Sequence, residues 1–208
     1  MNNIVTKTAV FAVICLICSN AAASPITNTY TMIPSDRDLD DLDHYWHYSW
    51  GIDTPWDITP DENGEYERVV GATLSFDNIR NWDNNPNVLY IHLLDTARLG
   101  VRQGYDHQGY GNHFEDAGPE LVTYINLPST SQDLTYEFTE DELSALDNFA
   151  FDGRFGLGFD PDCHFYNRGV QLEVRTETAT TPVVPEPATM AILLAGGVAV
   201  IRRKRRGA

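Results

Sequence analysis

Hydrophobic and polar residues alternate in short runs through the middle of the chain. In the segment 170–175, Val170, Leu172 and Val174 alternate with polar residues, which is the period of a half-buried strand. The run VLYIHLL at 88–94 is apolar enough for a central strand. Further strands are predicted over the segments 29–33, 45–51, 69–76, 121–125, 134–138 and 154–159.

One short helix is predicted among these strands. Thr139 is followed three residues later by Glu142, which fits a capping box. Leu143, Leu146 and Phe149 then place one apolar face on the segment 140–148. Connections rich in Asn, Asp and Gly separate the strands. The pattern predicts an all-β fold, an antiparallel two-sheet sandwich of jelly-roll type with one short helix. A β-barrel is the structural alternative.

The N-terminal segment has the order of a secretory signal peptide. Lys7 supplies a positive charge, the run 8–18 is almost wholly apolar, and three alanines precede Ser24. Cleavage is therefore expected after Ala23, and a retained N-terminal anchor is the alternative. An acidic domain over 24–175 is expected to follow. The stretch 176–184 is rich in Thr and Pro, which predicts an extended linker.

The C-terminal segment joins a short apolar run to a basic cluster. Residues 188–201 are apolar or small, and as a helix they would span about 21 Å. A hydrocarbon core is about 30 Å thick, so this helix is a short membrane anchor. The positive-inside rule keeps the basic cluster in the cytoplasm and the acidic domain outside. The expected membrane-stop residues are Arg202, Arg203, Lys204, Arg205 and Arg206.

The order of these features resembles a known sorting signal. Pro185, Glu186 and Pro187 precede the apolar helix and the basic cluster, and the whole segment 185–208 resembles the PEP-CTERM signal of Gram-negative bacteria. The resemblance implies that the tail holds the exported protein in the inner membrane until an exosortase, a membrane-embedded protease-transpeptidase, cleaves near the motif. The alternative is a permanently anchored inner-membrane protein with a periplasmic domain.

The resemblance also bears on the location and on the central domain. It implies a protein of the cell surface or the medium, associated with exopolysaccharide and the biofilm matrix. The stretch 152–170 resembles the final strands of uncharacterised secreted β-sandwich domains in other PEP-CTERM proteins. That likeness implies a secreted β-sandwich and no established activity.

Charge narrows the choice of partners. The chain has 30 Asp and Glu residues against 14 Lys and Arg residues, for a net charge of −16. Lys7 and the C-terminal basic cluster lie outside the central domain, so the domain itself is more acidic than the whole chain. Such a surface repels nucleic acid and favours cations and solubility. No nucleic-acid partner is expected.

Two acidic loops are candidate calcium sites. Asp36, Asp38 and Asp40 alternate in one loop, and Asp160 and Asp162 lie two residues apart in another. Oxygen ligands at this spacing can converge on Ca²⁺. The alternatives are a solvated acidic loop for the first group and turn capping by Asp for the second.

His44 and His47 lie three residues apart. On a helix they would share one face and could ligate zinc, whereas on a strand they would point to opposite faces. The aromatic residues around them favour a strand. The spacing therefore argues against one zinc ion shared by this pair.

The tryptophans are candidate carbohydrate contacts. Flat aromatic rings stack on the apolar faces of sugars, and neighbouring polar side chains bind sugar hydroxyls. Packing in the interior of a sandwich is the alternative for each ring. The residues concerned are Trp46, Trp50, Trp56 and Trp82.

Together these patterns predict an exported, exosortase-processed structural or binding protein of the cell surface or the exopolysaccharide matrix, with Ca²⁺ as the expected ion. An enzyme is not expected, because the chain lacks a nucleophile motif such as GxSxG, and we assign no catalytic residue. The alternative is a secreted carbohydrate-active enzyme of the glycoside hydrolase type, because paired carboxylates are plentiful.

Overall fold

The computed structural model describes residues 25–35, 39–106 and 111–180. The sequence assignments to the signal peptide at 1–23, to Asp36 and Asp38, and to the tail with its sorting motif, anchor helix and basic cluster lie outside the described residues. So does the part of the expected linker from 181 to 184.

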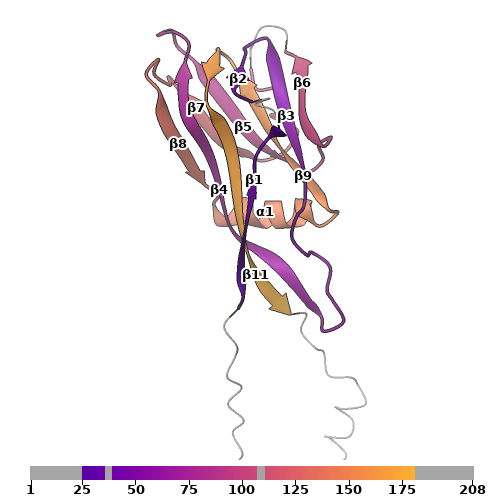
Figure 1. Ribbon diagram of the computed structural model, residues 1–208. Coiled ribbons are helices and arrows are strands. Elements are labelled where there is room, and N and C mark those ends of the chain that lie inside the picture. Colours follow the sequence, from indigo (N-terminus) through magenta and orange to yellow (C-terminus); the bar gives the residue numbers. More distant parts are fainter. Residues whose placement is uncertain (1–24, 36–38, 107–110, 181–208) are drawn as a thin grey trace, which may run out of the picture.

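Two antiparallel sheets form the body of the protein (Figure 1). The strands of the first sheet are β1 (Thr27–Met32), β2 (Asp41–Leu42), β4 (Glu65–Asn81), β8 (Gln132–Glu137), β10 (Phe165–Tyr166) and β11 (Gly169–Thr180). The strands of the second sheet are β3 (Trp46–Asp53), β5 (Val88–Leu94), β6 (Gly100–Tyr105), β7 (Glu120–Ile125) and β9 (Arg154–Pro161). The predicted all-β, two-sheet fold is confirmed.

The order of the strands places β9 and β4 at the centre. The first sheet runs β1-β11-β4-β10-β2, with β8 also paired to β4, and the second runs β6-β3-β9-β5-β7. Alternate residues of the central strands point into the space between the sheets. Phe159 of β9 meets Phe76 of β4 edge to face, with ring centroids 6.1 Å apart. The core therefore lies between the two sheets, as in other aligned sandwiches.

The helix α1 (Glu140–Ala150) forms where the capping box predicts it. Thr139 accepts a hydrogen bond from the Glu142 backbone, and the Glu142 side chain accepts one from the Thr139 backbone. Leu146 is fully buried. The Asp147 side chain accepts a 2.9 Å hydrogen bond from the backbone of Val69. These contacts fix the helix against β4.

The structure extends the strand pattern in two ways. The strands β2, β6 and β10 were not predicted from the sequence, and β11 continues through Thr176 to Thr180, which the sequence assigned to the linker. The extension forms because β4 offers a partner along the whole length, with Thr180 opposite Glu65. The β-branched threonines of this segment also suit a strand.

Both described chain ends lie at the same end of the sandwich. β1 pairs antiparallel with β11, so that Thr27 lies opposite Glu177. Figure 1 shows β11 ending at this lower pole, while β6 ends at the opposite, upper pole. The fold therefore separates the exit of the two chain ends from the loop that follows β6.

Candidate metal centre

The outer face of the second sheet carries an unusual group of polar residues. On β3, Tyr48 and Trp50 face the core, so the alternate residues His47 and Ser49 face outward. His47 lies opposite Gly104 on β6. A Cβ atom on Gly104 would come within 2.4 Å of His47 Nε2, so only glycine leaves room for the imidazole here.

Two described parts of the connection from β6 to β7, Asp106 and the segment 111–119, lie on this outer face. The Asp106 backbone donates to the Tyr45 carbonyl over 2.8 Å. Further along, the ring of Phe114 packs on Gly158 of β9, where a Cβ atom would meet the ring at 2.8 Å. Phe114 is only 6% exposed. The segment thus forms a small second core on the outside of the sheet.

His92 helps to hold the end of this segment. Its Nδ1 lies 3.1 Å from the Gly118 carbonyl, and the Leu93 backbone donates to the Pro119 carbonyl over 3.0 Å. With Nδ1 protonated, the imidazole of His92 donates to Gly118. The segment is therefore fastened to both β3 and β5.

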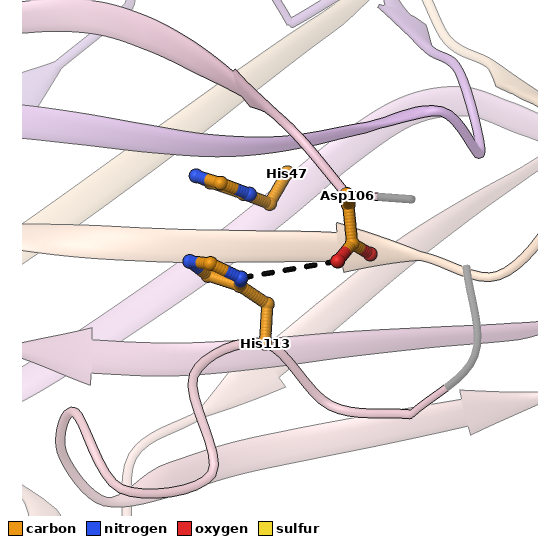
Figure 2. A group of neighbouring side chains, drawn as sticks. All are labelled: His47, Asp106 and His113. Atoms are coloured by element: carbon orange, nitrogen blue, oxygen red, sulfur yellow. Dashed lines mark ion pairs between the residues drawn. The ribbon is translucent and has the colours of Figure 1, made fainter. Parts of the chain in front are cut away.

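His47, Asp106 and His113 converge in this outer core (Figure 2). The two imidazoles stack with ring centroids 3.5 Å apart and planes inclined by 10°. Asp106 Oδ1 lies 3.8 Å from His113 Nδ1. One potential ligand atom from each of the three side chains lies within 4.8 Å of the other two. Figure 2 shows the parallel rings and the carboxylate that faces their edge.

Two further carboxylates lie beside this triad. Asp160 is 0% exposed, and its Oδ2 accepts a 2.7 Å hydrogen bond from the His113 backbone. Asp162 follows Pro161 at the end of β9, and its backbone donates to the Val88 carbonyl over 2.9 Å. Asp160 Oδ1 and Asp162 Oδ1 are buried and have no hydrogen-bond partner among the described residues.

The crowding of carboxylates changes their protonation. Burial, together with the nearby carboxylates of Asp106 and Asp162, raises the pKa of Asp160 to about 7, although the hydrogen bond from the His113 backbone opposes the shift. Burial and the charge of Asp106 raise the pKa of Asp162 to about 6. Burial and the neighbouring ring of His113 lower the pKa of His47. The shift at His47, which the charge of Asp106 opposes, favours the neutral form of that ring, and the neutral imidazole is the metal-binding form.

The candidate calcium ligands do not all lie at one place in the structure. Asp160 and Asp162 join the cluster, whereas Asp40 precedes β2, and its carbonyl accepts a hydrogen bond from the Asn167 backbone over 2.9 Å. Asp36 and Asp38 lie outside the described residues. The structure thus places the second acidic loop in a site with histidines, which the sequence had not associated with it.

The candidate carbohydrate residues divide between core and surface. Trp50 and Trp56 are each 4% exposed and belong to the hydrophobic core. These two rings are therefore not available for surface stacking. Trp46 is half-buried and meets Tyr105 edge to face at 5.7 Å. Trp82 is 57% exposed.

Sequence reasoning missed Asp106, His113 and Gly104 as parts of one site. His44, which it paired with His47, lies beside Tyr45 and Asp43 instead. The one sequence signal for such a site was that His47, on a strand, points to the outer face of the sheet. The partners on other elements could not be inferred from spacing, because they meet only through the strand pairing.

Comparison with known proteins identifies the tail. Residues 183–206 match the PEP-CTERM protein-sorting motif, so the resemblance noted in the sequence is confirmed. The motif indicates an exported protein that is targeted to an exosortase and sorted through the membrane toward the cell surface. Within the described residues, no helix is long and apolar enough to cross a membrane.

Other comparisons concern the described domain. No curated protein matches the sequence. A structure of recombinantly expressed latent aurone synthase, a polyphenol oxidase, matches with 8% identity and a TM-score of 0.38 over 64% of this chain and 25% of that chain. A structure of the same enzyme from a natural source matches with 7% identity and a TM-score of 0.36 over 68% of this chain and 26% of that chain. The match spans about a quarter of each of those chains.

Proposed function

We propose that this protein is an exosortase-processed structural or binding component of the cell surface or the exopolysaccharide matrix. The observation that carries the proposal is the sorting motif at residues 183–206. The β-sandwich supplies a stable body without a disulfide among the described residues, where Cys163 is a free thiol. The acidic composition keeps such an exported domain soluble and away from anionic surfaces.

A partly exposed row of aromatic rings supports a contact with polysaccharide. Trp82 lies against His164, with ring centroids 6.1 Å apart, and His164 lies 4.6 Å from the ring of Tyr166. The guanidinium carbon of Arg80 is 5.4 Å from the Tyr166 ring centroid, and Asp41 pairs with His164. Flat rings beside charged groups suit the apolar faces and the hydroxyls of a sugar. Of the four tryptophans, Trp82 is therefore our choice for sugar contact.

Calcium dependence is the second part of the proposal. The acidic loop that contains Asp40 has oxygen ligands of the kind that Ca²⁺ prefers. A calcium ion there would bridge the domain to an anionic polysaccharide. Asp160 and Asp162 are less suited to calcium, because two imidazoles share their site.

The glycoside hydrolase alternative gains little from the geometry. Its general acid would need a raised pKa and access to the glycosidic oxygen. Asp160 meets the first condition, but its side chain is fully buried at the site covered by the segment around Phe114. We therefore keep a non-catalytic role as the proposal.

The experiment follows the protein through sorting. Wild type and a triple variant, Pro185→Ala, Glu186→Ala and Pro187→Ala, are expressed in a host that has an exosortase, and inner membrane, surface and medium are probed with an antibody to the domain. The wild type is expected in the surface or medium fraction at reduced mass. The variant is expected to remain in the inner membrane at full length.

A matched control replaces Thr178 and Thr180, which precede the motif, by Ser. It should sort as the wild type does. Equal processing of the triple variant and the wild type would contradict exosortase sorting at this motif. Full-length wild type in the inner membrane alone would favour the permanent-anchor alternative.

A further inference from the structure

We propose that His47, Asp106 and His113 bind one divalent transition-metal ion of the Zn²⁺ class, with the carboxylates of Asp160 and Asp162 beside them. This site does not depend on the sorting or the sugar contact proposed above. It is argued from the donor atoms, the burial and the unpaired polar groups of the outer core.

The donor geometry is the first argument. The three potential ligand atoms lie within 4.8 Å of one another. Ligands on one zinc ion, at about 2.0–2.2 Å from the metal, are separated by about 3.4 Å in a tetrahedron. Because an imidazole binds a metal along a lone pair in its own ring plane, the two stacked rings must also turn away from their parallel arrangement for both to reach one ion. His47 belongs to β3, Asp106 directly follows the neighbouring strand β6, and His113 precedes Phe114 on the outer face.

The unpaired buried atoms are the second, independent argument. His47 Nδ1, Asp106 Oδ2 and Asp160 Oδ1 are buried and accept no hydrogen bond from a donor group among the described residues. The carboxyls of Asp106 and Asp160 can form a hydrogen bond to each other only when one of them is protonated. Buried polar groups almost always have a partner, and leaving one without a partner destabilises the fold. When both carboxyls are ionised, the three atoms offer lone pairs from nitrogen and oxygen, which a bound cation would accept.

The local charge supports the same conclusion. The charges that act on Asp160 are the carboxylates of Asp106 and Asp162. Like charges so close together repel one another, and a bound cation would relieve the repulsion. A divalent ion would compensate two of the charges.

The ligand types select the metal. Ca²⁺ and Mg²⁺ are bound by oxygen ligands, whereas imidazole suits Zn²⁺ and its neighbours among the transition metals. Two stacked imidazoles beside a carboxylate resemble the mixed nitrogen and oxygen sets of such sites.

The position of the site indicates what the metal would do. His47 belongs to β3 and Asp106 follows β6, whereas His113 precedes Phe114, whose ring packs on Gly158 of β9. A metal between them would join the segment to the sheet. Asp160 would act as a positioning residue, because its Oδ2 already holds the His113 backbone. Metal binding is therefore expected to stabilise the native state.

The test uses the full chain, purified in detergent and freed of metal with EDTA. Isothermal titration with Zn²⁺ should give one site with micromolar or tighter affinity, and the melting temperature should rise by about 5 °C or more at an excess of about 100 times the dissociation constant. Co²⁺ in place of Zn²⁺ should give visible absorption of a low-coordinate site. No binding of either ion would overturn the proposal.

Variants assign the site to its residues. His47→Ala and His113→Ala should each weaken Zn²⁺ binding by about 100-fold or more, because loss even of a supporting residue weakens metal sites by about 10–100-fold. The control is His44→Ala, a nearby histidine outside the cluster, which should bind as the wild type does. Equal loss in His44→Ala, or no loss in His47→Ala and His113→Ala, would overturn the assignment.

Two measurements on the wild type keep the test decisive if a variant does not fold. Zn²⁺ should shift the ring proton resonances of His47 and His113 in NMR spectra and leave those of His44 and His164 unchanged. Ca²⁺ at millimolar concentration should not displace the Zn²⁺. Displacement by Ca²⁺, or shifts at His44 and His164 alone, would contradict a transition-metal site in this cluster.

Discussion

His47 and Gly104 lie directly opposite each other on β3 and β6, and the imidazole occupies the space that a side chain at position 104 would fill. This relationship makes a glycine on an edge strand part of the histidine cluster. It also couples the sequence of β6 to the orientation of a residue on another strand.

The first prediction follows from this contact. Gly104→Ala should displace the His47 ring, because the added Cβ atom would lie 2.4 Å from Nε2. We expect Zn²⁺ affinity to fall by about 10–100-fold and the metal-free protein to lose about 1–3 kcal/mol of stability through overpacking. Calorimetric titration and urea unfolding measure the two effects. The exposed neighbour is the control, and Gln103→Ala should change neither quantity.

The second prediction concerns the outer core. Phe114→Ala should reduce the free energy of unfolding by about 3–5 kcal/mol, as is usual for truncation of a buried phenylalanine. The ring packs on Gly158 and meets the His113 ring edge to face at 4.9 Å. Phe151 is 70% exposed, so Phe151→Ala should stay within about 0.5 kcal/mol of the wild type. Similar losses in the two variants would show that the outer segment contributes little.

The third prediction concerns Glu67, which ties β1 and β11 to β4. Its carboxylate accepts hydrogen bonds from Tyr30 at 2.7 Å, from Thr176 at 2.7 Å and from the Asp57 backbone at 2.9 Å. Glu67→Gln should therefore destabilise the fold by about 1–3 kcal/mol at neutral pH. Glu65→Gln, an exposed change on the same strand, is the control and should be nearly neutral.

The effect at Glu67 should depend on pH in one direction. Burial alone would raise the pKa of Glu67, but the hydrogen bonds from Asn28, Asp57, Thr176 and Tyr30 lower it below the usual range. A carboxylate with a lowered pKa in the folded state stabilises the protein above its unfolded pKa and loses this contribution as the pH falls through the folded value. Urea unfolding at a series of pH values should show the gap between wild type and Glu67→Gln narrowing below about pH 4. A gap that widens in acid would rule out this role.

The fourth prediction separates surface from core tryptophans. Trp82→Ala should weaken retention of the domain on matrix polysaccharide while the melting temperature stays unchanged, because Trp82 is largely exposed. Trp50→Ala should instead lower the free energy of unfolding by about 3–5 kcal/mol, because Trp50 is buried in the core. Co-sedimentation with the polysaccharide and thermal unfolding provide the two readings. Unchanged retention of Trp82→Ala would remove the aromatic row as a sugar contact.

Elements with a clear local sequence pattern could be predicted, whereas elements that form only because a partner strand lies beside them could not. The strand Val88–Leu94 and the helix after Thr139 follow from local pattern and capping alone. The strand β6 has no clear alternation, and two glycines interrupt it. It forms because β3 supplies a partner, and this partner lies elsewhere in the sequence. The same holds for the last residues of β11, which depend on the length of β4.

The candidate site shows the same division. Asp160 and Asp162 were singled out by their spacing, and both take part in the cluster. The ion expected from them was Ca²⁺, because no local pattern indicates that two imidazoles lie beside them. His113 is 47 residues from Asp160 along the chain, yet its backbone bonds to that carboxylate. Such a contact is a product of the topology, and local residue patterns cannot supply it.

The shared exit of the chain ends has a consequence for orientation during sorting. Thr180, the last residue of β11, stands only three positions before the matched motif. The 17 residues of β4 run from this pole toward the other, a path of at most about 56 Å. Asp106 directly follows β6, which ends at the pole opposite the end of β11 (Figure 1), so the histidine cluster lies away from the end of the sandwich that leads to the motif. An exosortase acting near the motif would thus meet the opposite end of the sandwich from the cluster.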